Sequence, residues 1–432
     1  MKPLPPLRLP RQLLDPHRSD LRPAADGLVA VRLIEQQGLI TAIEPLEAAA
    51  MKEPLPLALT PLLEPHGHLD KAFSWPEAPN LDGTMAAAIA ANLAEHQLRS
   101  AELVLKRAGR ALEQGWRYGL RAIRSHVDAH GEAAQLSWEV LEDLRRQWVG
   151  RLELQLVAMA PLGHWATPAG REQARLVAAS GGLLGGALGP PFEIGSAERD
   201  GLEELLRLAD GLGCGVDLHV DEADDAPGRG VALLLAAMRR LRITIPVTCS
   251  HASSMGLLAP AACAAMAERL AEAGVVVVAL PLTNHWLLGR RPGQTPSRRP
   301  LAPIRQLQRA GVAVAVGGDN VQDPWYPGGD GDPLETLRQA VPAAQLHPWR
   351  RQDLAAFTTV PARLLGLAWD GVLRPGAPAD LVLLAASGWP ELLGRSPERR
   401  VLRGGAWLPP PLPSPLSSQL AACLPSPCPE RS

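Results

Sequence analysis

The sequence predicts an α/β fold: a (β/α)8 TIM-like barrel with a small β-sandwich domain formed from both termini. Eight short apolar runs each end in a polar turn, and Ala-, Leu-, Arg- and Glu-rich helical segments follow them. From the second run to the seventh, the ends recur about every 32 residues, close to the roughly 30 residues of a strand plus crossover helix. Period-two alternation near both ends of the chain predicts the additional sheet.

The eight runs are predicted strands that end near residues 66, 126, 155, 187, 219, 251, 283 and 319. The fourth has the lowest β-propensity because it contains several glycines, Gly182, Gly185, Gly186 and Gly189. A doubly wound open sheet is the alternative. It is disfavoured because no GxGxxG turn follows the first strand, and eight nearly equal units suit closure into a barrel.

The flanking segments divide the chain into four predicted regions. Residues 1–58 and 366–408 form the two parts of the small β domain, and residues 59–365 form the barrel. The alternating stretches 26–46 and 371–384 carry this prediction. Residues 409–432 are rich in Pro and Ser, so we expect a disordered tail, with a polyproline II ligand as the alternative.

Composition excludes several classes of function. The 432 residues carry 43 basic and 45 acidic side chains, a formal charge of -2, and no basic stripe that would follow a phosphate backbone. We therefore expect no nucleic-acid partner. The sequence contains no run of 18 apolar residues that would predict a membrane segment. Prolines and charges interrupt the first 20 residues before a signal-like apolar core can form. We therefore expect a cytoplasmic protein. The five cysteines lack CxxC spacing and suggest no disulfide framework.

Polar residues that could bind a metal stand at the ends of four predicted strands. His66 and His68 follow the first strand, and their spacing of two places both rings on one side. His219 ends the fifth strand, His251 the sixth and Asp319 the eighth. Strand ends converge at the C-terminal face of such a barrel, so residues far apart in sequence meet there.

Imidazole and carboxylate groups suit a divalent iron or zinc ion. The alternative for each histidine is a hydrogen-bonded structural residue. Barrels with two bridged metals resemble one another in using a carboxylated lysine at the fourth strand, but no lysine lies near residue 187. We therefore expect one metal ion. Lys71 could reach the mouth of the barrel or lie on the surface.

Several motifs together carry a family resemblance. They are "EPHGHLD", "GLRAIRSHVD", "LELQLVA", "DLHVDEADD", "SHASSM", "PLTN" and "GGDNVQDPWYP". Through them, residues 30–405 resemble the cytosine deaminase branch of the amidohydrolase superfamily. The resemblance implies His66, His68, His219 and Asp319 as metal ligands, with Gln155, Glu222 and His251 in the pocket. It also implies a small heterocyclic substrate and a homo-oligomer.

The chemistry implied is hydrolytic deamination, with cytosine converted to uracil and ammonia. A metal makes a water molecule nucleophilic near neutral pH, and Asp319 can take its proton. His251 would orient the nucleophile and Glu222 would protonate a ring nitrogen. Gln155 offers a donor and an acceptor to the pyrimidine edge. Trp325 could cover the ring or simply belong to the core, and His126 and Asp128 could support the ligands.

Three residues depart from the cytosine deaminase pattern. Gly318 and Asn320 flank Asp319 where those enzymes tend to have histidine and aspartate, and Lys71 resembles the "HLDK" form of relatives acting on triazines and other cyclic amidines. Because Asn320 borders the substrate, the ring can differ from cytosine. The alternatives are an amidohydrolase acting on an N-alkylamino triazine or other cyclic amidine, and a non-catalytic scaffold. Stoichiometric metal would distinguish an enzyme from a scaffold.

Overall fold

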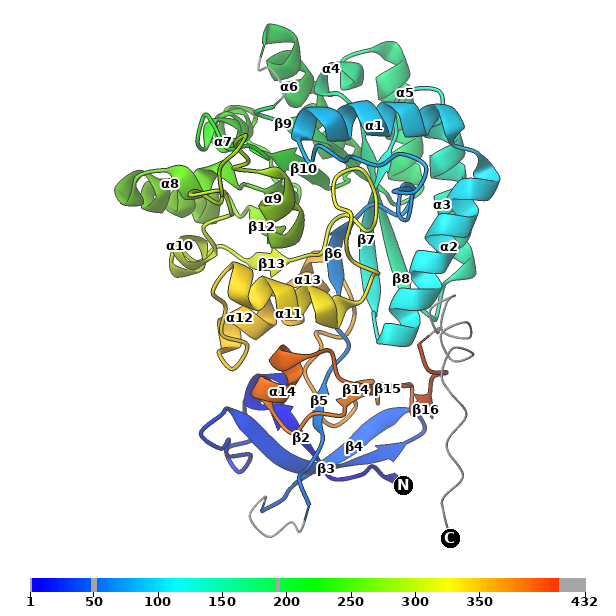
Figure 1. Ribbon diagram of the computed structural model, residues 1–432, viewed down its shortest axis with the longest axis vertical. Helices are drawn as coiled ribbons and strands as arrows, with labels where there is room; N and C mark the ends of the chain where they lie inside the picture. Colours follow the sequence, from blue (N-terminus) through cyan, green and yellow to red (C-terminus); the bar gives the residue numbers. More distant parts are fainter. Residues whose placement is uncertain (1, 48–52, 192–194, 412–432) are drawn as a thin grey trace.

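A computed structural model describes residues 2–47, 53–191 and 195–411. It confirms the predicted class: one sheet of eight parallel strands and a second, mostly antiparallel sheet made from both ends of the chain. Figure 1 places the small sheet at one end of the barrel and helix α1 across the upper part of the barrel, away from that sheet. The predicted tail lies outside the described residues from 412 onward. No helix in the described ranges is long and apolar enough to cross a membrane.

The barrel strands follow one another in chain order. They are β6 (Glu64–Gly67), β7 (Ala122–Asp128), β8 (Glu153–Met159), β9 (Leu183–Leu188), β10 (Val216–Val220), β11 (Val247–His251), β12 (Val276–Ala279) and β13 (Val314–Val316). Just beyond β13, a parallel bridge pairs Gly67 with Asp319, and the Asp319 amide donates to the His66 carbonyl at 3.1 Å. This contact brings the last strand against the first, so the open-sheet alternative is wrong.

Helices surround the barrel between the strands. They are α1 (Met85–Leu98), α2 (Ala101–Tyr118), α3 (Ala134–Gln147), α4 (Leu162–Trp165), α5 (Pro168–Ala179), α6 (Ser196–Leu212), α7 (Arg229–Leu241), α8 (Pro260–Glu272), α9 (Pro281–Leu287), α10 (Ile304–Arg309), α11 (Pro333–Ala343), α12 (Arg351–Ala355) and α13 (Thr359–Leu364). Apolar residues at helical spacing bury one face of most of these helices, as in α6 with Leu202, Leu205, Leu206 and Ala209.

The small sheet joins segments from the two ends of the chain. Its strands are β1 (Lys2–Pro3), β2 (Leu7–Pro10), β3 (Leu28–Gln36), β4 (Leu39–Pro45), β5 (Leu57–Leu59), β14 (Leu381–Leu384), β15 (Arg399–Arg403) and β16 (Ala406–Trp407), with α14 (Trp389–Gly394) beside them. The antiparallel pairing of β5 with β14 links the two parts of the chain. Alternate residues of β2 and β3 enter a shared apolar core.

Close packing explains why β9 contains glycines, which β-propensity alone does not. A Cβ atom at Gly186 would lie 2.6 Å from the Ala160 carbonyl oxygen, and one at Gly185 would lie 2.7 Å from the Asp217 carbonyl oxygen. Neighbouring backbone therefore approaches this strand too closely for any side chain. The strand forms despite its low β-propensity because close packing requires these glycines.

Two strand ends differ from the prediction by four residues, and the eighth strand, β13, ends at Val316, three residues before the predicted end at 319. The third strand, β8, continues to Met159 instead of ending near 155, because apolar residues 156–159 extend the pleat. The seventh strand, β12, ends at Ala279, and Pro281 begins α9. The first correction moves Gln155 to the other end of its strand, with consequences for the site.

Candidate metal-dependent active site

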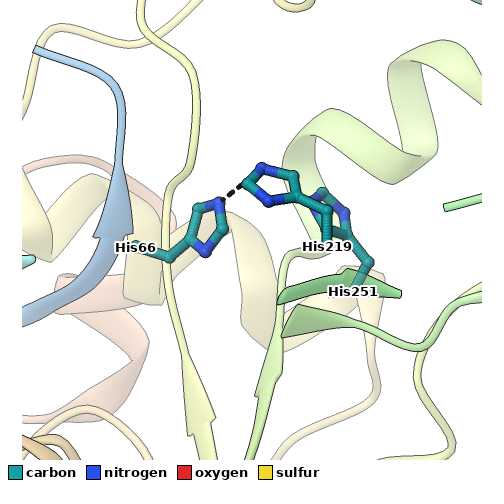
Figure 2. A group of neighbouring side chains, drawn as sticks. All are labelled: His66, His219 and His251. Atoms are coloured by element: carbon teal, nitrogen blue, oxygen red, sulfur yellow. Dashed lines mark hydrogen bonds between the residues drawn. The ribbon is translucent and has the colours of Figure 1, made fainter. Parts of the chain in front are cut away.

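Four of the predicted ligands converge at the C-terminal ends of the barrel strands. The Nε2 atom of His219 lies 3.2 Å from Nε2 of His66 and 3.4 Å from Nε2 of His68. Asp319 Oδ1 lies 3.5 Å and 3.3 Å from the same two Nε2 atoms. Figure 2 shows the ring of His66 on one side of the barrel pointing toward His219 on the other, with His251 beside it.

These separations fit a tetrahedral metal site. Ligand atoms about 2.0–2.1 Å from a tetrahedral ion lie about 3.3–3.4 Å from one another. Four of the six separations among these ligand atoms, from 3.2 to 3.5 Å, span that value. Both oxygens of Asp319 are also buried and have no hydrogen-bond partner among the described residues. Buried acceptors that face each other in this way are satisfied when a cation occupies the space between them.

Hydrogen bonds orient the first two ligand rings toward this point. The carbonyl of His126 lies 3.2 Å from His68 Nδ1 and can only accept, so Nδ1 carries the proton and Nε2 keeps its lone pair. The hydroxyl of Ser250 donates to Asp217 Oδ1 at 2.8 Å, which leaves its oxygen to accept from His66 Nδ1 at 2.9 Å. Such outer partners fix the tautomer that binds a metal.

The electrostatics keep the rings of His66, His219 and His251 neutral. Burial, followed by the neighbouring imidazoles, lowers the pKa of both His66 and His219 well below the usual range. Burial is also the main reason why the pKa of His251 falls to about 4. Neutral imidazole is the form that ligates a metal, so burial and mutual repulsion prepare the rings for binding.

A cavity of about 530 Å³ opens from the ligand cluster toward α1. Its inner part is formed by Lys71, Glu222, His251, Asn320 and Trp325 beside His68, His219 and Asp319. Most of its outer part is apolar and includes Met85, Ile89, Leu93, Met159, Pro161 and Leu162. Its size falls within the roughly 300–1,000 Å³ of pockets that enclose drug-sized ligands.

Glu222 and His251 lie together at the inner end. Glu222 Oε1 is 3.6 Å from His251 Nδ1, and the Asn284 side-chain nitrogen is 3.1 Å from the same Nδ1 atom. Burial, with the nearby Asp319 charge, raises the pKa of Glu222 well above its usual range. The carboxyl of Glu222 is therefore suited to hold a proton at neutral pH.

Gln155 does not belong to this cavity, so its predicted placement is wrong. Its side-chain oxygen accepts from Arg124 Nε at 2.8 Å, and Arg124 also pairs with Asp217 at 2.7 Å inside the barrel. Gln155 is four residues before the end of β8, or about 13 Å along a strand. Met159, Ala160 and Pro161 occupy the corresponding place at the mouth.

Three polar residues, Lys71, His96 and Asp217, have contacts near the site that sequence reasoning did not assign to them. Lys71 is buried, its Nζ atom lies 2.7 Å from Asp128 Oδ1 and 4.7 Å from the centre of the Trp325 ring, and it lines the cavity. His96, on helix α1, also lines the cavity. Asp217 stands two residues before His219, so period-two alternation could have found it on the same face of the strand.

Gly318 and Asn320, the two residues beside Asp319 that depart from the cytosine deaminase pattern, each have neighbours that explain them. A Cβ atom at Gly318 would lie 2.8 Å from the Thr336 hydroxyl and 3.0 Å from Glu64 Oε2, so these two side chains fill the place where a larger residue would lie. The Asn320 amide donates to Asp323 at 2.8 Å, which directs its oxygen toward the Thr283 hydroxyl. Asn320 therefore presents a neutral, fixed amide at the edge of the cavity.

Comparison with known proteins identifies the family. The profile described as "Amidohydrolase family" matches residues 81–406. The chain belongs to this family. It is 35% identical over 396 residues to a pterin deaminase of Rhizobium rhizogenes (strain K84 / ATCC BAA-868), covering 89% of each chain. The family confirms the expected class of enzyme, a hydrolase acting on C–N bonds of cyclic substrates.

Two solved structures share the whole architecture. A 5-methylcytosine deaminase from Klebsiella pneumoniae, liganded with 5-fluorocytosine, superposes with a TM-score of 0.78 at 26% identity over 94% of this chain and 98% of its own. An N-isopropylammelide isopropylaminohydrolase from Burkholderia multivorans ATCC 17616 gives 0.71 at 26% identity with the same coverage. These structures agree with the predicted resemblance to a deaminase branch.

We predict that His66→Ala abolishes metal retention, because it removes one of four donors and the ring that Ser250 orients. Metal per chain, measured by inductively coupled plasma mass spectrometry after gel filtration, should fall from about one to near zero. His17→Ala, at an exposed position outside the cluster, serves as the matched control and should keep the wild-type content. Full occupancy in His66→Ala would remove His66 from the ligand set.

Proposed function

We propose that the protein is a metal-dependent hydrolytic deaminase of a fused two-ring amino heterocycle of the pterin type. In this reaction water replaces an exocyclic amino group on a ring carbon, which leaves a ring carbonyl and releases ammonia. The observation that carries the proposal is the 530 Å³ cavity beside the four-ligand cluster, which has more room than a single six-membered ring needs. The extensive similarity to a pterin deaminase supports the same substrate class.

The proposed site holds one divalent iron or zinc ion between His66, His68, His219 and Asp319. The ion would make a water molecule acidic enough to act as the nucleophile near neutral pH. Asp319 has a second oxygen without a partner in the described part of the chain, and that oxygen accepts the proton from the water. His251 lies beside the cluster, where it orients the nucleophile and stabilises the tetrahedral carbon.

Glu222 is the proposed general acid. It lines the cavity next to His251 and holds a proton because it is buried near Asp319. Protonation of the ring nitrogen next to the attacked carbon makes that carbon more electrophilic. Asp319 then passes the proton that it took from the water to the departing amino group, and the C–N bond breaks to release neutral ammonia. As the ring carbonyl forms, the hydroxyl proton returns to the Glu222 carboxylate.

Three residues are proposed to recognise the ring in place of Gln155. Burial lowers the pKa of Lys71, but Asp128 and Asp70 outweigh it and hold the pKa above the ordinary value. Lys71 therefore remains a cation that can donate to a ring carbonyl oxygen. Trp325 stacks against the ring plane, and the Asn320 oxygen accepts from a ring N–H. A neutral amide at 320 suits a ring that presents a donor there.

A substrate panel tests the reaction and the ring. Metal-loaded protein should release ammonia from pterin at least tenfold faster than from cytosine, because the smaller ring leaves the outer cavity unfilled. N-isopropylammelide, assayed for isopropylamine release, represents the alternative amidohydrolase reaction. Faster turnover of cytosine than of pterin would show that the substrate has a single ring. Release of isopropylamine without release of ammonia from any ring would show that the protein catalyses the alternative amidohydrolase reaction.

We predict that Glu222→Gln retains its metal but loses at least about a hundredfold in kcat, because an amide cannot donate the required proton. Steady-state kinetics with metal analysis of the same sample measures both quantities. Glu198→Gln, the same substitution at the outer rim of the cavity, is the control and should keep wild-type turnover within about twofold. Activity of Glu222→Gln within a few-fold of wild type would contradict the acid role.

A further inference from the structure

Helix α1 forms one wall of the cavity, and its first turn packs against α9 through Met85 and Ala88, which meet Leu287 and Leu288 in a small apolar cluster. Of its fourteen residues, all of them described, two are buried, Ala88 and Glu95. The residues that line the cavity fall on one helical face: Met85, Ile89, Asn92, Leu93 and His96. Figure 1 shows α1 crossing the upper part of the barrel, away from the small sheet. In the C-terminal half of α1 the buried residue is Glu95, so polar contacts must fix that end of the helix.

Buried ion pairs provide that anchor. The Glu95 carboxylate accepts from Arg107 at 2.6 Å and from Arg99, the residue that caps the C-terminal end of α1. Arg99 also donates to Asp70 at 3.0 Å and to Asp128 at 3.3 Å. Buried ion pairs contribute more to a defined geometry than to net stability. The network therefore fixes where α1 lies relative to Asp70, two residues after His68, and to Asp128 at the end of β7.

Asp128 connects this helix to the cation in the cavity. One carboxylate oxygen, Oδ1, accepts from Lys71 Nζ at 2.7 Å, and the other, Oδ2, lies 2.8 Å from His96 Nε2. Since a carboxylate only accepts, His96 must donate through Nε2. Lys71 has three N–H donors, of which one is directed to Asp128, so the ammonium can still donate into the cavity.

We propose that His96 is a positioning residue for the deamination: it holds Asp128, and Asp128 holds the Lys71 ammonium where the substrate ring needs it. This inference rests on the proposed function, in which Lys71 binds a ring carbonyl. His96 itself does not touch the reacting atoms. Its contribution is transmitted from α1, so the outer wall of the cavity helps to set the inner recognition site.

Replacement of His96 tests this role. His96→Leu removes the donor at similar volume and should raise both KM for the turned-over ring and Kd for its deaminated product about tenfold, the usual size for a hydrogen bond to a charged group. The Kd is measured by isothermal titration calorimetry. His96→Gln places an N–H near the position of Nε2 and should restore both constants to within about threefold. Gln97→Leu, on the exposed side of α1, is the matched control and should change neither constant.

A double-mutant cycle separates positioning from general support of the fold. If His96 acts through Lys71, His96→Leu should have no further effect on KM or Kd in a Lys71→Met background. An equal effect in both backgrounds would overturn the proposal, as would wild-type constants in His96→Leu alone. If His96→Leu fails to fold, His96→Asn replaces it, because the shorter amide cannot reach Asp128.

The two proposals fail in different ways. Wild-type protein that releases ammonia from no ring of the panel, although loaded with metal, contradicts the proposed function. Normal wild-type turnover with an additive cycle leaves that function in place and overturns the role of His96 alone. The metal content of every variant is measured as well, because loss of the ion would also weaken binding and must be distinguished from a displaced Lys71 ammonium.

Discussion

The meeting of three imidazole nitrogens and one carboxylate oxygen at separations of 3.2–3.5 Å is the constraint on which the site depends. Four lone pairs that face one another in a buried space repel, and burial away from water adds a further cost. A divalent cation bound between them would convert that repulsion into coordination bonds. The barrel supplies the required geometry because it brings the ends of β6, β10 and β13 to one point, although these strands are up to 250 residues apart.

The need to orient these side chains explains the polar residues inside the barrel next to the candidate ligands. Asp217 sits among Arg124, Ser250 and His126, and through Ser250 it fixes the ring of His66. Glu64 accepts from the backbone of His66 and Gly318, next to the first and last ligands. These contacts orient the ring of His66 and hold the backbone next to Asp319. Toward the mouth, the ion pairs around Asp70 and Asp128 continue this arrangement to α1.

Much of the fold and of the metal cluster could be predicted from sequence because both depend on local periodicity. Apolar runs mark the strands, and the polar residues near the ends of those runs are the candidate ligands that the fold brings together. Gln155 shows the limit, since an error of four residues in the end of β8 moves a side chain from the mouth to the interior. The backbone pairing of β7 with β8 decides that point, and a single sequence does not display it.

The outer wall was harder to predict for a different reason. His96 lies on a helix whose amphipathic pattern is weak, because its inner face borders a cavity and its anchor is a set of ion pairs. Its meeting with Asp128, 32 residues away, depends on how α1 crosses the barrel. The space taken by Thr336 and Glu64 beside Gly318 is likewise a tertiary contact. Such contacts become visible only when the chain is folded.

The most direct test of the account is anomalous diffraction from crystals of protein purified with its metal, recorded at the iron and zinc absorption edges. We expect one peak per chain, about 2.0–2.1 Å from the nearest atoms of His66, His68, His219 and Asp319. The edge at which the peak appears identifies the metal. A second peak in the cavity, or a single peak held by other residues, would contradict the mononuclear four-ligand site.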